Sequence, residues 1–103
     1  MNTKNRNITD IVLMDKVTGT TTSTEGVALF LLMDKTIKSG KVVRLSLHGS
    51  TPLSSSFLNA TFGELYDKYG ISKIRTSIVL VNYLPSHAKT IKKYLENVEK
   101  LVK

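Results

Sequence analysis

The chain has 103 residues, of which 41% are hydrophobic and 22% charged. It is therefore long enough for one domain with a core, and its composition differs from that of a disordered protein. We expect a single domain over residues 1–103, with residues 1–7 as a flexible N-terminal arm. The absence of cysteine excludes a disulfide framework, a thiolate metal site and a cysteine nucleophile, and favours a reducing compartment.

The charge and hydropathy of the chain limit the kinds of partner that it can bind. The net charge of +7 arises from 15 Lys and Arg against 8 Asp and Glu, a balance that suits an acidic partner but also an ordinary solvated surface. The longest apolar run, residues 27–33, is far shorter than the roughly 20 residues of a membrane span. The polar N-terminus lacks the apolar segment of a signal peptide. We expect a cytoplasmic protein that does not contact a membrane.

Three segments have the pattern of β-strands. The first is the apolar run 11–14, in a strand that begins near Ile8. The second, residues 41–47, alternates apolar and polar side chains, which predicts one buried and one partly polar face. The third, residues 74–81, contains four consecutive apolar residues, a pattern typical of a strand covered on both faces.

A helix follows each strand. The first begins at a cap supplied by Ser23 or Thr24 and runs to about residue 38. The second begins within residues 54–56 and ends at Gly70, and the third begins near Pro85. Three consecutive strand–helix units predict an α/β fold with a short central sheet, parallel strands and right-handed crossovers.

The segment from the second strand into the second helix resembles a known family. The residues that carry the resemblance are Val43-Arg44-Leu45-Ser46-Leu47, Leu53-Ser54-Ser55-Ser56-Phe57-Leu58-Asn59 and Phe62-Gly63-Glu64-Leu65. Together with Ser23-Thr24-Glu25-Gly26 at the start of the first helix and Asn82 after the third strand, they are similar to the STAS-like domain family of unknown function. The resemblance extends over roughly residues 22–98 and implies a STAS-like fold.

The resemblance also implies a function. STAS domains resemble anti-sigma-factor antagonists, which bind a kinase-like ATPase and are controlled by phosphorylation of a serine at a helix N-terminus. In their motif an Asp precedes two serines and a glycine. Ser55 and Ser56 match the serines, whereas Ser54 stands in place of the Asp and Phe57 in place of the glycine. The resemblance thus implies a regulatory module that docks on a protein partner.

The loops after the three strands meet at one edge of a parallel sheet, where ligands and partners usually bind. We call this edge the rim and define it as residues 18–24, 48–56 and 82–87. Its candidate contacts are Thr24, His48, Ser54, Ser55, Ser56 and Asn82. A serine that only caps the helix explains the serine run equally well. Apart from Glu25, no acidic residue lies near the rim to orient His48 or His87 as a base, so we expect neither catalysis nor a metal or cofactor.

Two helices suggest further interfaces. Phe30 and Leu31 belong to a run that is apolar all round the first helix, which indicates a protein interface or a homodimer, or else a helix buried on both sides. The last helix carries several lysines on its polar face. A basic nucleic-acid-associated protein is therefore the alternative function, although Glu96 and Glu99 interrupt the basic face, so that weak, non-specific binding is the most we expect.

Overall fold

The fold is built on a three-stranded parallel sheet. A computed structural model describes residues 7–50 and 52–101, so the expected N-terminal arm lies almost wholly outside the described residues. The strands β1 (Ile8–Val12), β2 (Val42–Ser46) and β3 (Ile78–Val81) pair in the order β1-β2-β3. The register places Ile11 opposite Leu45, and Leu45 opposite Leu80. The predicted α/β class and parallel sheet are confirmed.

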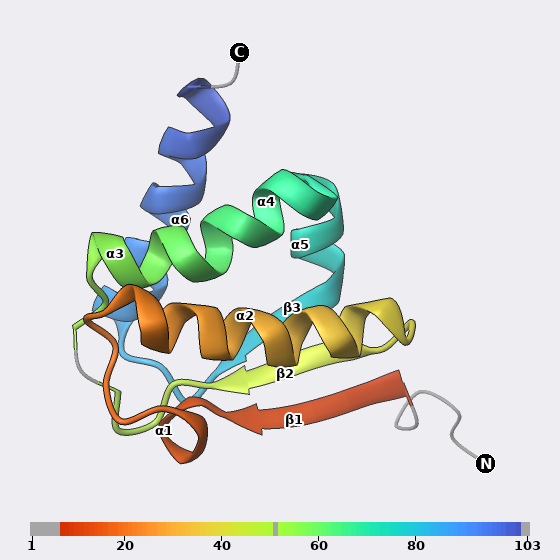
Figure 1. Cartoon of the computed structure of the whole chain (residues 1–103), viewed down its shortest axis with the longest axis horizontal. Helices are drawn as coiled ribbons and strands as arrows, with labels where there is room; N and C mark the ends of the chain where they lie inside the picture. Colours follow the sequence, from red (N-terminus) through yellow and green to blue (C-terminus); the bar gives the residue numbers. More distant parts are fainter. Residues whose placement is uncertain (1–6, 51, 102–103) are drawn as a thin grey trace.

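The strand order determines where the helices lie. Because both crossovers run to the next strand in the same direction and such crossovers are right-handed, their helices lie on one face of the sheet. Figure 1 shows this layer of helices beside the sheet. The helices are α1 (Leu13–Lys16), α2 (Ser23–Lys38), α3 (Ser55–Leu58), the π-helix η2 (Asn59–Gly63), α4 (Glu64–Tyr69), α5 (Ile71–Ser77) and α6 (Pro85–Leu101). Among the described residues no helix has both the length and the hydropathy to cross a bilayer.

The two faces of the sheet differ in burial. On the face toward the helices, Val43 and Leu45 are fully buried and join one core cluster. On the opposite face Asp10 and Arg44 form an exposed ion pair, and Val79 is 47% exposed. Burying apolar surface stabilises a fold by roughly 25 cal/mol per Å², so the helix side holds the fold together. The other face is open among the described residues.

Helix α2 packs against the α3–η2 segment at van der Waals distance from its backbone. A Cβ on Gly26 would lie 2.5 Å from the carbonyl oxygen of Phe57 and 2.9 Å from Oγ1 of Thr61. That Oγ1 is within hydrogen-bond distance of the carbonyl oxygens of both Gly26 (2.8 Å) and Phe57 (2.9 Å). Only glycine permits this approach, which explains its presence in the first turn of α2 despite its low helix propensity.

The π-helix η2 is the place where the last helix attaches. Tyr94 of α6 donates its hydroxyl to Oδ1 of Asn59 at 2.6 Å, and the same hydroxyl lies over Gly63, where a Cβ would be 2.6 Å away. Thr61 and Phe62 in the middle of η2 are buried. The wide turn thus contacts both α2 and α6.

The third strand and its surroundings differ from the sequence prediction. Residues 71–77, expected partly as strand, form the helix α5, and only the last four residues of the run are extended. The expectation that this strand is covered on both faces is wrong, because β3 is an edge strand and one side of the sheet is open. Likewise, the first strand ends at Val12 and the next residues turn into the short helix α1.

A buried carboxylate joins α2 to α4. The side chain of Asp34, 10% exposed, accepts a hydrogen bond from the hydroxyl of Tyr69 at 2.5 Å and pairs with Lys68 and Lys38. The hydrogen bond from Tyr69, followed by that from Lys68, holds the pKa of Asp34 at about 2, below its ordinary value of 3.8. Because the pKa is lowered in the folded state, this carboxylate stabilises the fold above about pH 4 and loses that effect as the pH falls toward 2.

Asp34→Asn should remove this pH dependence. We expect the variant to lose about 1 to 2 kcal/mol of unfolding free energy at pH 7 and to show a flatter decline between pH 4 and 2 than the parent. Urea unfolding at a series of pH values measures both quantities, with Asp15→Asn at an exposed position of α1 as control. Parallel pH curves for Asp34→Asn and the parent would contradict the assigned role.

Gly26→Ala should destabilise the protein, although the same change inside an ordinary helix stabilises it by up to about 1 kcal/mol. The added methyl group would meet a backbone carbonyl that cannot move without separating α2 from α3, and overpacking of this kind costs about 1–3 kcal/mol. Thermal unfolding shows whether the variant is less or more stable than the parent. Gly63→Ala serves as control, since its nearest neighbour is the movable hydroxyl of Tyr94, and it should cost less.

Candidate functional site

The rim is the candidate site, because the loops that leave β1, β2 and β3 all lie at the carboxyl edge of the sheet. Ser46, the last residue of β2, is buried and is bonded to two rim residues. Nδ2 of Asn82 donates to Oγ of Ser46 at 3.0 Å, and the backbone N–H of His48 donates to the same oxygen at 3.3 Å. Asn82 has a φ of 52°, in the left-handed region that asparagine adopts more readily than most residues. It therefore shapes the turn after β3.

The two histidines have different environments. His48 is exposed in the loop after β2, as expected. His87, expected in a loop, lies in the first turn of α6 and is only 8% exposed. Its Nδ1 is 3.5 Å from Oγ of Ser50, at the outer limit of a hydrogen bond. Among the described residues no group of His, Asp and Glu side chains is arranged to hold a metal ion. That the chain is not an enzyme stays a prediction.

Helix α2 is capped one residue earlier than predicted. Thr22, rather than Ser23 or Thr24, is the N-cap: its Oγ1 accepts from the N–H of Glu25 at 3.2 Å, and Oε1 of Glu25 accepts from the N–H of Thr22 at 3.2 Å. This reciprocal box requires the acidic residue three positions after the cap, so Glu25 selects Thr22. Thr24 is left exposed in the first turn.

The carboxylate of Glu25 is held by hydroxyl groups. Its Oε2 accepts from Oγ1 of Thr18 at 3.0 Å, and its Oε1 accepts from Oγ1 of Thr22 at 3.0 Å. Desolvation acts to raise the pKa of Glu25, but the hydrogen bonds from Thr22, Thr18 and Thr21 together lower it. Glu25 is thus a charged structural group that fixes the loop before α2.

In the serine run, one residue is the cap and two are exposed. Oγ of Ser54 accepts from the N–H of Phe57 at 3.1 Å and donates to the carbonyl oxygen of Thr21 at 2.8 Å. Ser55 and Ser56 follow in the first turn of α3, exposed, and their side chains make no hydrogen bond within the described part of the chain. The capping interpretation therefore holds for Ser54 and leaves the other two hydroxyl groups accessible.

The N-termini of α2 and α3 lie side by side at the rim. The backbone N–H of Ser54 donates to the carbonyl oxygen of Thr20 at 3.1 Å, and Ser54 also bonds Thr21 through its side chain. Each helix N-terminus carries a partial positive charge from its unpaired N–H groups. The first turns of both helices consequently present hydroxyl side chains on the same part of the surface, and the carboxylate of Glu25 offsets the positive end of α2.

Sequence reasoning missed the apolar part of the rim. Tyr83 is 46% exposed and Leu84 61% exposed, in the turn between β3 and α6. Large exposed apolar side chains close to hydroxyl groups are typical of protein-binding surfaces. The sequence signal that could have indicated them is Pro85, which begins α6. Both residues come immediately before it, and a turn there brings them to the rim.

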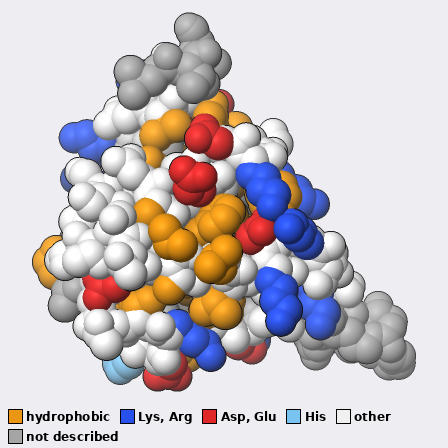
Figure 2. Space-filling view, viewed as in Figure 1, with side chains coloured by type: hydrophobic (Ala, Val, Ile, Leu, Met, Phe, Trp, Pro, Cys, Tyr) orange, Lys and Arg blue, Asp and Glu red, His pale blue; other side chains and the backbone are white. Residues whose placement is uncertain are grey.

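The two predicted interface residues of α2 have different environments. Leu31 is 58% exposed, and Val27, one turn earlier, is 45% exposed. Phe30 is half buried and packs on the core. Figure 2 shows apolar side chains gathered in the middle of the face that carries α2. A protein interface or a homodimer through this surface stays a prediction, with Leu31 as the accessible residue of the pair.

The basic face of α6 is interrupted as the sequence indicates. Lys89, Lys92 and Lys93 are exposed, as is Glu96. Lys92, Glu96 and Glu99 also border an apolar groove rather than a continuous positive patch. The alternative function of nucleic-acid binding gains no specific observation from this arrangement.

Comparison with known proteins gives one match. A family model described as a STAS-like domain of unknown function matches residues 25–87, more than half of the chain. No curated protein and no solved structure matches significantly. The matched segment contains α2 except for its first two residues, all of β2 and β3, and the serine run.

Replacing the three serines one at a time should show which serine caps α3 and which are only exposed. Ser54→Ala should lower the free energy of unfolding by about 1 kcal/mol or more, because the cap and the bond to Thr21 are both lost. Ser55→Ala and Ser56→Ala should change it by less than about 0.5 kcal/mol. Urea unfolding measures the three variants. Equal losses at Ser54 and Ser55 would contradict the assignment of the cap.

Proposed function

Because the chain belongs to the STAS-like domain family of unknown function, we propose that it is a cytoplasmic regulatory module, without catalytic activity, that docks on a protein partner through the rim. The partner that the resemblance to anti-sigma-factor antagonists favours is a kinase-like ATPase. One observation carries the proposal. Ser55, which the resemblance matches to the regulated serine, is exposed at a helix N-terminus and is not needed as the cap.

The departures from the regulated-serine motif are compatible with this proposal. Ser54 stands where the motif has Asp, and both residue types are effective N-caps, so the substitution preserves the helix start. Phe57 stands where the motif has glycine and is 1% exposed in the core. It therefore changes the interior of the protein rather than the surface that a partner would contact.

The surroundings of Ser55 suit a reversible phosphate. A phosphoserine carries a charge of about −1.5 to −2 at neutral pH and is tolerated where helix N–H groups face it. The N-terminus of α2 lies next to that of α3, but the carboxylate of Glu25 already accepts hydrogen bonds there, so the N–H groups of α3 are the ones that would face the phosphate. The same charge would be unfavourable against a partner that covers the rim, since the apolar Tyr83 and Leu84 belong to that surface.

Ser55→Asp should leave the fold intact and release the partner. We expect a change of less than about 0.5 kcal/mol in unfolding free energy, because an acidic residue in the first turn suits the helix dipole. Affinity for a kinase-like ATPase encoded beside this gene should fall at least about tenfold. Calorimetric titration measures the affinity, and urea unfolding the stability.

Ser72→Asp is the matched control. Ser72 is also an exposed serine in the first turn of a helix, α5, which leads to the amino end of β3 and so lies at the opposite edge of the sheet. The ATPase should bind this variant as tightly as the parent. If Ser55→Asp binds as tightly as Ser72→Asp, the rim is not the regulated surface.

A further inference from the structure

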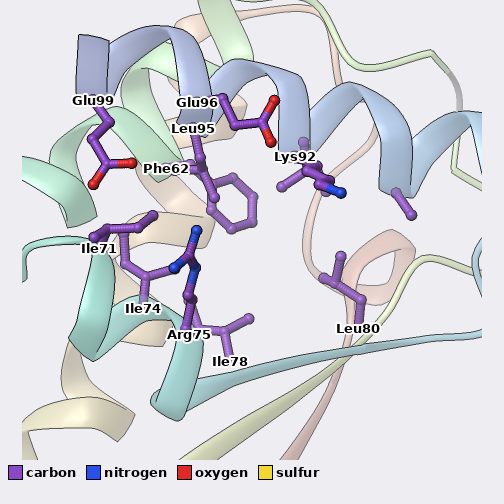
Figure 3. A pocket seen from close by; sticks show the side chains of 12 residues that line it. Phe62, Ile71, Ile74, Arg75, Ile78, Leu80, Lys92, Leu95, Glu96 and Glu99 are labelled. Atoms are coloured by element: carbon purple, nitrogen blue, oxygen red, sulfur yellow. The ribbon is translucent and has the colours of Figure 1, made fainter.

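A groove runs between α6 on one side and α5 with β3 on the other, away from the rim serines. It has a volume of about 340 Å³ and is lined mainly by apolar side chains. Those that point into it include Phe62, Ile74, Ile78, Leu80, Ile91 and Leu95. Figure 3 shows α6 passing over the opening with Leu95 and Phe62 above Ile78. A concave, mainly apolar site of this volume is typical of pockets that bind a ligand.

The groove lies along an unpaired strand edge. β3 is the last strand of the sheet, and its four residues, Ile78–Val81, are all apolar, with no lysine, proline or bulge of the kind that protects natural edges. The carbonyl oxygen of Val81 accepts from the N–H of Leu47 and so faces β2. Because successive residues of a strand direct their main-chain groups to opposite sides, the N–H and C=O of Leu80 face the free edge.

These two features fit one occupant. We infer that the groove and the free edge of β3 together bind an extended segment of a partner protein as a fourth strand. Main-chain hydrogen bonds to Leu80 would hold the segment in register, as in other cases of strand addition. Every second side chain would enter the groove beneath α6, where Leu95 and Ile91 already point. The alternate side chains would lie on the open, partly polar face of the sheet, beside Val79.

The small number of contacting residues argues against a second copy of this chain as the occupant. Two β3 strands paired edge to edge would share only four residues each. A stable interface has roughly 20–30 residues a side. The second copy would also present its own hollow to this one, and two concave surfaces leave both grooves unfilled. A separate segment would fill the groove and also form hydrogen bonds with the main-chain groups at the free edge of β3.

Charged side chains of both signs border the mouth of the groove. Figure 3 shows Glu96 next to Lys92 on α6, with Glu99 toward Ile71 and Arg75 on the opposite side. A bound segment can therefore carry charged residues of either sign beside its apolar positions.

Selection from a displayed library of random peptides about nine residues long tests the inference with the whole chain as bait. We expect enriched peptides with apolar residues at every second position, the period of a strand. Enrichment of apolar residues at positions three and four apart would instead indicate an amphipathic helix in the groove and would overturn the proposal. So would the absence of any enriched peptide.

Two variants locate the bound peptide. Ala88, half buried on α6, lines the groove, so Ala88→Trp should fill it and weaken a selected peptide at least about tenfold. Thr90→Trp places the same side chain on an exposed position of α6 that does not line the groove and should leave the affinity unchanged. Far-ultraviolet circular dichroism confirms that both are folded. Equal affinities would refute the groove as the site.

N-methylation of the peptide tests the main-chain bonds. Methyl groups on every second nitrogen block one edge of a strand, so one methylated set should abolish binding and the alternate set should leave it nearly unchanged. Ser55→Asp should not affect the peptide, because its position lies at the rim. If the groove does not bind the peptide, the proposed function of the rim is therefore not contradicted. Equal effects of the two methylated sets would overturn strand addition.

Discussion

The handedness of two crossover connections determines most of what this chain presents to a partner. Because β1, β2 and β3 follow one another across the sheet, right-handed connections place their helices on the same face. The parallel direction of the strands brings the N-termini of α2, α3 and α6 to the carboxyl edge. The position of the rim therefore follows from the parallel strands, and the open sheet face follows from the handedness of the crossovers.

The rim is also held together from within. Gly26 allows α2 and α3 to approach until backbone meets backbone, and Ser54 connects the start of α3 to the loop before α2. The two helix N-termini therefore move as one unit, and Ser55 projects from a rigid support. Binding surfaces with fixed side chains lose little conformational entropy on association. A domain of this size can thus use a small surface efficiently.

The sequence predicted the class of fold and the position of each main helix because these depend on strong local signals. These signals are the alternation of apolar and polar residues in β2, the glycines after α2 and α4, and Pro85 at the start of α6. The serine run was recognised, but its cap was not resolved, since Ser54, Ser55 and Ser56 are chemically identical and only their contacts in the folded chain, with Phe57 and with the loop before α2, distinguish them.

What the sequence could not show depends on long-range contacts. The apolar run 78–81 resembles a strand buried on both faces, and nothing local reveals that it lies at the edge of an open sheet. The cap Thr22 could have been found from Glu25 three residues later, but neighbouring hydroxyl residues competed with it. The groove beside β3 involves residues from η2, α5 and α6 and had no signal in any single segment.

The way α6 is attached has a consequence for how the protein comes apart. Of its apolar side chains with described burial, only Ile91 is fully within the core, whereas Ala88 and Leu95 are half covered, and the hydroxyl of Tyr94 supplies one polar bond to η2. An element with so little buried area opens at a lower free energy than the sheet and α2 do. Heating should therefore detach the C-terminal helix before the remaining layers separate. A segment bound along β3 would add contacts beneath α6 and bring its melting closer to that of the whole fold, so that occupancy of the groove would determine whether the protein unfolds in two steps or in one.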